Sequence, residues 1–402
     1  MELDLLYEVT VAKPWEGGQR KAEQAKLQST IEQVKLADQL GFRTAWFVEH
    51  HFREGRSHCS APEVLIGALS QVTKQIRLGF GVALMPHGFT HPVRVAEKVA
   101  TADLLSGGRV EWGSGRSTAG EQAGFGVPHG ELSRDQWRDA VQSVVAMWAN
   151  DRFTWDSEFL KFPTPRPVLP KPFQQPHPPA WTAAVSEGSA ATAGRAGLGL
   201  LSFSILRSVE TMARHIREYR EAARNPEPLT DVTLNRVAAY TLVHCADSVA
   251  ALAASDVWEA VWWWYQNHAE LALEWDFPEF SQQQRDAMFP LLKKRLDGDF
   301  DVAEFSNEDM VIVGDVDQCV TKMKRYADAG VDQLICYSEF GHLPHEAIMA
   351  NIERLGREVL PQIRDYVPDP DAFPAGGDAS ATTGGLTLGP GGVTSSPVAG
   401  SA

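Results

Sequence analysis

The sequence predicts an α/β fold, namely a (β/α)8 TIM barrel with insertions and a disordered C-terminal tail. Eight short apolar segments typical of buried strands alternate with helical patterns within the first 366 residues. Eight alternating units favour a closed parallel barrel over an open, doubly wound sheet. The segment 367–402 is rich in Gly, Pro, Ser, Thr and Ala, so it buries too little apolar surface to fold. We therefore expect one barrel domain over residues 1–366 and a disordered tail over residues 367–402.

The expected strands are apolar runs of strand length, flanked by Gly, Pro or polar residues. The run 45–48, for example, is too short for a helix and follows Gly41. In chain order the strands cover residues 3–9, 45–48, 76–84, 109–113, 180–185, 199–203, 231–244 and 333–337.

The expected helices show apolar residues at helical spacing and residue types that favour helix ends. Gly41 ends the first helix, Ser60 and Pro62 open the second, and Ser133 caps the fourth. The helices cover residues 23–40, 61–73, 91–105, 133–149, 189–195, 209–223, 248–267 and 317–329, with a last one inside 344–366. Between these elements we expect a hairpin at 153–162, a proline-rich crossing loop at 163–179 and an aperiodic stretch at 270–307.

Composition excludes several classes of partner. The chain has 402 residues and a formal net charge of −15, from 37 basic and 52 acidic side chains. Nucleic acids and anionic membranes attract basic patches, so neither is expected as a partner. No apolar run approaches membrane-spanning length, and the N-terminus shows no signal peptide. The four cysteines are scattered without a Cys-x-x-Cys pair, which fits a cytoplasmic protein with neither a disulfide framework nor a metal site.

Three polar stretches fall at the carboxyl ends of predicted strands, where TIM barrels place their active sites. They are Glu-His-His at 49–51, the glycine-rich stretch 112–118 and the stretch 185–189. Arg116 can hold a phosphate or carboxylate, and hydroxyl and N–H groups at the start of a helix, near Ser186 and Ser189, form an anion site. Each stretch alone has an ordinary explanation as a surface ion pair or helix cap. Together, at adjacent strand ends, they predict one phosphate pocket.

The first stretch is expected to present only one face to this pocket. Side chains alternate along a strand, so Glu49 and His51 should point one way, and His50 the other way with Val48. Further along the chain, the aromatic run 262–265 is expected to pack partly in the core and partly against a substrate. The aperiodic stretch 270–307 that follows is typical of an active-site lid.

Motifs of other enzyme classes are missing. The glycine pairs at 79–81 and 113–115 lack the third glycine of a Rossmann fingerprint. The sequence contains neither Gly-x-x-x-x-Gly-Lys-Ser/Thr nor the Gly-x-Ser-x-Gly of serine hydrolases.

The sequence resembles bacterial luciferase and the luciferase-like flavin-dependent monooxygenases up to about Tyr366. The most specific matches are Glu-His-His-Phe at 49–52, the run 91–97 together with 103–109, and Gly-Ser-Gly-Arg at 113–116. The resemblance implies a (β/α)8 barrel that binds FMN at its C-terminal face. It also implies that reduced FMN and dioxygen oxidise a small organic substrate, while the protein supplies position, electrostatics and exclusion of water.

The resemblance also implies roles for particular residues. His50 corresponds to the catalytic histidine, Gly81 and Val82 to a non-proline cis peptide under the flavin ring, and Arg116 to the arginine on the flavin phosphate. Two departures stand out: Gly115 replaces the reactive cysteine of luciferase, and Val185 replaces a glutamate, so light emission does not follow. The phosphate loop would use Ser186 and Ser189 as side-chain contacts and the backbone of Val185, Glu187 and Gly188. We expect the substrate pocket to include Glu8, Trp112 and Trp264.

The chain has no NAD(P)H fingerprint, so we expect a separate NAD(P)H:flavin reductase as partner, and a homodimer is possible. Two alternatives stay open at this point. One is a deazaflavin-dependent or flavin-dependent hydride-transfer oxidoreductase of the same fold, which oxygen uptake with reduced FMN would distinguish. The other is a non-catalytic flavin-binding protein, which the presence of His50 and of the phosphate site argues against.

Overall fold

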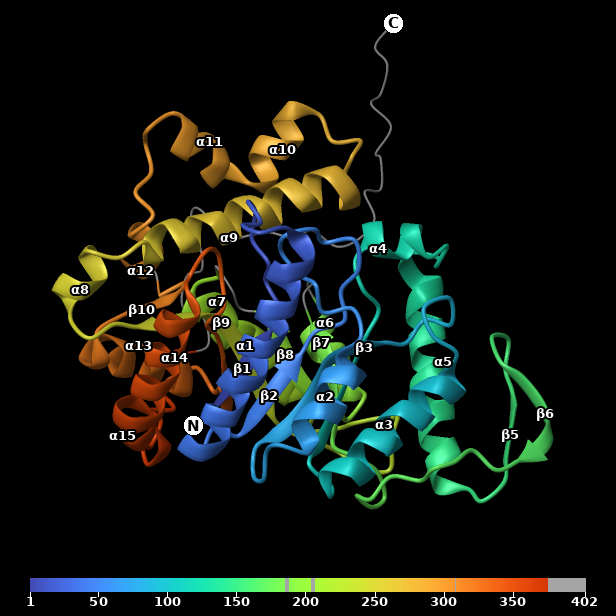
Figure 1. Cartoon of the computed structure of the whole chain (residues 1–402). Coiled ribbons are helices and arrows are strands. Elements are labelled where there is room, and N and C mark those ends of the chain that lie inside the picture. Colours follow the sequence, from blue (N-terminus) through green and yellow to red (C-terminus); the bar gives the residue numbers. More distant parts are fainter. Residues whose placement is uncertain (185–187, 204–206, 308, 375–402) are drawn as a thin grey trace, which may run out of the picture.

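The computed structural model describes residues 1–184, 188–203, 207–307 and 309–374, and confirms the closed parallel barrel (Figure 1). Eight strands pair in parallel around a closed ring, in which the last strand of the barrel returns to the first. In ring order they are β1 (Glu2–Tyr7), β2 (Thr44–Phe47), β3 (Arg77–Leu84), β4 (Val110–Gly115), β7 (Ala180–Ala184), β8 (Gly199–Phe203), β9 (Val237–Cys245) and β11 (Gln333–Tyr337). A short extra strand, β10 (Ile312–Gly314), pairs with the end of β9.

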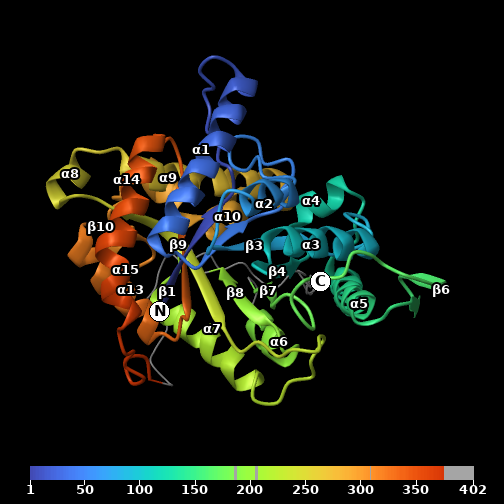
Figure 2. The ribbon, with the colours of Figure 1, turned by 60° about the horizontal axis from the view of Figure 1, so that its bottom comes forward.

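Helices surround the ring of strands (Figure 2). The apolar face of each helix packs on the outside of the barrel, while bulky side chains fill its lumen. Trp46 lies edge-to-face against Trp181 there, with ring centroids 5.6 Å apart. A Cβ on Gly79 would lie 2.2 Å from the Trp46 ring, so this position excludes any larger residue. The helices are α1 (Gln19–Leu40), α2 (Pro62–Ser70), α3 (Pro92–Ser106), α4 (Ala119–Gly124), α5 (Gly130–Ala149), α6 (Ser189–Arg195), α7 (Val209–Ala222), α13 (Val316–Asp328), α14 (His345–Arg354), the π-helix η2 (Leu355–Val359) and α15 (Leu360–Arg364).

Two insertions extend the barrel. The antiparallel hairpin β5 (Phe153–Asp156) and β6 (Lys161–Arg166) projects from one side (Figure 1) and runs four residues beyond the expected hairpin. The second insertion lies between β9 and β10, across the barrel end that appears uppermost in Figure 1. It consists of α8 (Val249–Ala253), α9 (Val257–Leu271), the π-helix η1 (Ala272–Asp276), α10 (Gln282–Met288), α11 (Pro290–Leu296) and α12 (Glu304–Asn307).

The structure corrects several expected boundaries. The stretch 270–307 is largely helical, but its helices after α9 have only four to seven residues, which is too short for a helical period to show in the sequence. Strand β4 continues to Gly115, so the glycine-rich stretch is partly strand, and β9 begins only at Val237. Helix α4 was not expected, because its six residues carry little apolar pattern.

The expected tail boundary at residue 367 lies inside the described structure. The Asp369 N–H donates to Asp328 over 2.8 Å, and Arg217 donates to the carbonyl oxygen of Phe373 over 3.0 Å. The guanidinium of Arg325 lies 5.8 Å from the centroid of the Phe373 ring. Residues 367–374 therefore pack on α7 and α13, and residues from 375 onward lie outside the described part of the chain.

Candidate active site

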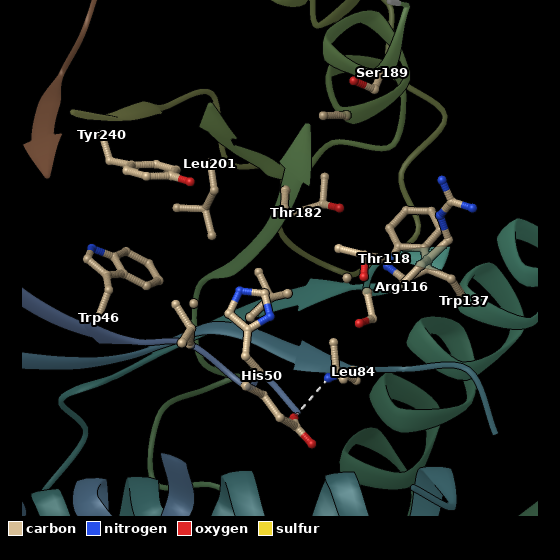
Figure 3. Close-up of a pocket in the computed structure, with 18 of the residues that line it drawn as sticks. Trp46, His50, Leu84, Arg116, Thr118, Trp137, Thr182, Ser189, Leu201 and Tyr240 are labelled. Carbon is tan, nitrogen blue, oxygen red and sulfur yellow. Dashed lines mark hydrogen bonds between the residues drawn. The ribbon is translucent and has the colours of Figure 1, made fainter. Parts of the chain in front are cut away.

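A cavity of about 760 Å³ opens at the carboxyl ends of the barrel strands, within the volume range of small-molecule and cofactor sites. Its walls come from all eight barrel strands and several of the loops after them, from α5 and α6, and from α9 and η1. In Figure 3, Arg116 and Ser189 lie on one side, Trp46 and Tyr240 on the other, and His50 between them. We call the Arg116 side the outer end and the Tyr240 side the inner end.

His50 lies in the middle of the cavity and is held in place by hydrogen bonds to neighbouring residues. Its Nδ1 lies 3.0 Å from Oε1 of Glu121, and its backbone N–H donates to the carbonyl of Cys59 over 3.0 Å. Glu121 is only 1% exposed and also accepts hydrogen bonds from Arg53 Nε (3.2 Å) and from the Ser117 hydroxyl. Burial raises the pKa of Glu121, but His50, Arg53 and the Ser117 hydrogen bond outweigh it and hold this pKa below its usual range. Glu121 is therefore a carboxylate.

The outer end contains a partly buried cation. Nη1 of Arg116 donates to Ser133 Oγ (2.8 Å) and to the Gly130 carbonyl (3.3 Å), both on α5. Burial lowers the pKa of Arg116, and nearby Arg134 lowers it further. Glu131 acts in the opposite direction, but none of the ion pairs among the described residues includes Arg116, so an anionic ligand at this end would be favoured.

The inner end contains an ion pair that is fully enclosed. Arg56 Nε donates to Glu8 Oε2 over 3.1 Å, and the two residues are 6% and 2% exposed. The Arg56 guanidinium also lies 4.8 Å from the centroid of the Trp264 ring and contacts His268. Burial lowers the pKa of His268 well below its ordinary value, and Arg56 acts in the same direction, so His268 is neutral. Apolar side chains complete this end, namely Leu6, Trp46, Leu201 and Ile335.

Helix α4 ties three parts of the site together through consecutive residues. Glu121 holds His50, and Gln122 Nε2 donates to the Arg116 carbonyl over 2.7 Å. The Gly120 N–H donates to Asp276 Oδ1 over 2.6 Å, which docks the insertion after β9 against the barrel. Both the central histidine and the outer arginine thus depend on one short helix.

Most of the predicted site residues that the structure describes meet in this cavity. Glu8, His50, Gly81, Val82, Arg116, Gly188 and Ser189 all line it. The Gly81–Val82 peptide bond is cis, in agreement with the resemblance. A Cβ on Gly115 would lie 2.4 Å from a methyl group of Val82, so this cavity wall has no room for a side chain there. Val185, Ser186 and Glu187 lie outside the described residues.

Two predicted pocket residues point elsewhere. Trp112 packs against Trp148 of α5, with centroids 4.9 Å apart, because its side chain faces the helical layer and not the lumen. Trp264 is fully buried behind His268, against which it stacks with centroids 5.1 Å apart. Neither is among the described residues that line the cavity.

The expected alternation of Glu49, His50 and His51 is only partly right: Val48 and His50 line the cavity and His51 does not, but Glu49 lines it as well. Strand β2 ends at Phe47, so strand geometry does not continue through these residues. Both Glu49 and His50 line the cavity, and Glu49 Oε2 accepts from the Leu84 N–H over 3.0 Å (Figure 3). His51 instead packs edge-on against Phe125, with centroids 4.7 Å apart.

Sequence reasoning missed several polar residues of the site. Arg53 and Arg56 directly follow the Glu-His-His stretch, and this position was the available signal for them. Glu121, Tyr240 and Asp276 had no local signal, because each lies in a segment with an ordinary helical, strand or irregular pattern.

Comparison with known proteins identifies the family. Residues 8–333 match the profile of the luciferase-like monooxygenases. The chain belongs to the luciferase-like monooxygenase family. Its relatives include the oxygenase component of a flavin-dependent trigonelline monooxygenase from Acinetobacter baylyi, 25% identical over 84% of this chain and 90% of the relative. An F420-dependent glucose-6-phosphate dehydrogenase from Beutenbergia cavernae is 26% identical over 87% of this chain and 97% of the relative.

A solved structure supports the fold in the same way. The monooxygenase RslO1 of Streptomyces bottropensis superposes with a TM-score of 0.68 at 24% identity, over 90% of this chain and 99% of that one.

Within the described residues, no helix has both the length and the apolar character needed to cross a bilayer. The same part of the chain shows no group of three or more His, Cys, Asp or Glu side chains arranged to hold a metal ion.

Proposed function

We propose that this protein is the oxygenase component of a two-component, FMN-dependent monooxygenase, which uses reduced FMN and dioxygen to oxidise a small organic substrate. The observation that carries the proposal is that His50, backed by Glu121, and Arg116, without an ion-pair partner among the described residues, open into one cavity. The flavin-dependent relative of similar length favours the same reading.

The residues of the cavity fit an FMN molecule. Arg116 would hold the phosphate, with Ser189 and Thr192 at the same end of the site, because a dianion would bind favourably to the partly buried guanidinium. The backbone of Gly81 and the side chain of Val82, which line the cavity, would contact the ring system. Bound reduced flavin would supply the electrons that activate dioxygen.

The chain itself would orient the reactants, exclude water and move one proton. His50 is the candidate for proton transfer, because an imidazole exchanges protons near neutral pH and this one is held in place by a carboxylate. The insertion after β9 would shield the site, since Asp276 and His268 both line the cavity beneath it. The apolar inner end would receive the substrate next to the Glu8–Arg56 ion pair.

Isotope labelling with 18O2 tests the proposal. The protein is mixed with reduced FMN under anaerobic conditions, then with 18O2 and a panel of small organic compounds. We expect substrate-dependent oxygen uptake and one 18O atom in the product, and we expect reduced FMN from any separate NADH:FMN reductase to support turnover. Failure to bind reduced FMN, or oxidation of NADH by the chain alone at the same rate, would contradict the two-component assignment.

A second candidate is hydride transfer with the deazaflavin F420, which the dehydrogenase relative favours through its coverage of almost the whole chain. The two candidates are separated by titrating the protein with FMN and with F420, and by the need for oxygen. F420 binding together with oxygen-independent turnover would select the dehydrogenase class, whereas FMN binding with oxygen-dependent turnover selects the monooxygenase.

A further inference from the structure

We propose that Glu121 is a positioning residue that fixes the tautomer of His50, so that His50 Nε2 faces the cavity as the proton-exchanging atom. The inference rests on the proposed function for the role of His50 in turnover. The tautomer itself is a property of the free protein and is measured without activity.

The geometry of Glu121 is that of a dedicated support. Its Oε1 lies 3.0 Å from His50 Nδ1 and accepts from the His51 N–H over 3.1 Å and from Arg53 Nε over 3.2 Å. Its Oε2 accepts from the Ser117 hydroxyl. Four donors from four residues thus converge on one carboxylate that is 1% exposed, which is the saturation expected for a buried charge.

This arrangement decides which nitrogen of His50 carries the proton. An ionised carboxylate only accepts hydrogen bonds, so the contact between Nδ1 and Glu121 requires a hydrogen on Nδ1. In neutral His50 the lone pair is then on Nε2. The His50 side chain is 27% exposed and lines the cavity, so Nε2 is the ring nitrogen available to a substrate or cofactor.

Glu121 Oε1 accepts from Arg53 Nε as well as from His50 Nδ1, so the acceptor of the His50 ring also binds a cation. The ionisable groups around His50 are Glu49, His51, Arg53, Glu121, His268 and Asp276.

Helix α4 explains why the support is rigid. Its residues on either side of Glu121 are bonded to other parts of the site, Gly120 to Asp276 and Gln122 to the Arg116 carbonyl. These two contacts anchor the helix on both sides of Glu121, and its carboxylate is held by its own four donors. If the contact between Glu121 and His50 served stability alone, His50 would not need to line the cavity.

The test is NMR of histidine ring nitrogens in the cofactor-free protein, with His50 assigned from a His50→Gln variant. We expect the Nδ1–H tautomer in the wild type. In Glu121→Gln, which keeps an acceptor oxygen but removes the charge, we expect the share of the Nδ1–H tautomer of His50 to fall. Glu121→Asp should recover part of it, and Glu353→Gln, an exposed glutamate on α14, should leave it unchanged.

Activity adds a second readout. With reduced FMN, Glu121→Gln should lower kcat about 10- to 100-fold, with FMN affinity within about twofold of wild type. An Nε2–H tautomer in the wild type, or identical tautomer populations of His50 in wild type and Glu121→Gln, would overturn the proposal. If Glu121→Gln fails to fold, Ser117→Ala and Glu121→Asp provide the same comparison. Absence of oxygenase activity in the wild type would refute the proposed function and leave the tautomer result standing.

Discussion

Arg53 Nη2 lies 3.3 Å from Asp276 Oδ2, so the insertion after β9 is tied to the loop that carries His50. The same Arg53 side chain donates through Nε to Glu121, which holds His50. Trp275, next to Asp276, stacks on Phe52 with ring planes 11° apart. The Arg53 guanidinium therefore contacts both the insertion and the carboxylate that orients His50.

We expect Asp276→Ala to loosen the insertion. The change leaves Arg53 and the Gly120 N–H without this acceptor, at a local cost of about 1–3 kcal/mol. Hydrogen exchange should accelerate across residues 272–296, and kcat/KM should fall. Asp286→Ala, which changes a partly exposed aspartate on α10 that contacts Gln282, is the matched control. Unchanged exchange in Asp276→Ala would show that other contacts hold the insertion closed.

Arg116→Ala should weaken FMN binding by about 1.5–3 kcal/mol, as expected for loss of charge-assisted hydrogen bonds to a phosphate. Fluorescence titration with FMN measures the effect. Riboflavin, which has no phosphate, should bind wild type and variant alike. The control is Arg94→Ala, which removes an exposed arginine on α3 that pairs only with Glu97 among the described residues. Equal FMN affinity in wild type and Arg116→Ala would remove Arg116 from the phosphate site.

His50→Ala should lower the chemical rate about 10²- to 10⁴-fold while FMN affinity stays near wild type, since His50 is assigned to proton transfer and not to binding. His51→Ala should affect the rate less and stability more, because His51 packs on Phe125 and away from the cavity centre. Single-turnover kinetics and thermal melts separate the two. The opposite ranking of the two variants would transfer the proton-transfer role to His51.

Two C-terminal truncations should show that residues 367–374 contribute to stability and that the residues after them do not. A chain that stops after Pro374 should keep the wild-type Tm, because the contacts of Asp369 and Phe373 are intact. A chain that stops after Tyr366 loses these contacts, and its Tm should fall by about 1–3 °C. Differential scanning calorimetry of the three chains measures the difference. Equal loss in both truncated chains would show that residues after 374 also contribute to stability.

Asp4 should make stability depend on pH. It is fully buried below the cavity, where burial raises its pKa to about 7 despite hydrogen bonds from Trp46 and Gln333. Its folded pKa lies above the unfolded value of 3.8, so the native state binds the extra proton. Its contribution is therefore fully present below about pH 4 and is lost as pH rises through 7. Asp4→Asn should remove this slope from urea-unfolding free energies measured between pH 4 and 8, and an unchanged slope would contradict the raised pKa.

The strands and long helices could be predicted from the sequence because their signals are local. A buried strand such as β11 is a short apolar run, and a helix such as α1 ends at Gly41, which adopts a left-handed conformation with φ of 81°. His50 and Arg116 could be placed at strand ends for the same reason. The short helices after α9 could not be predicted, because a helix of one or two turns has too few residues for a period.

The sequence by itself determined the barrel, the location of the site and two of its central residues. The tertiary structure alone decided how that site is supported. Glu121 meets His50 across 71 positions of the chain, and Arg53 meets Asp276 across 223. Such pairs form because closing the barrel brings loops from different strands to one end. The local sequence around each partner carries no signal for these contacts. They depend on how the folded chain brings the elements together in space, and not on any pattern along the chain.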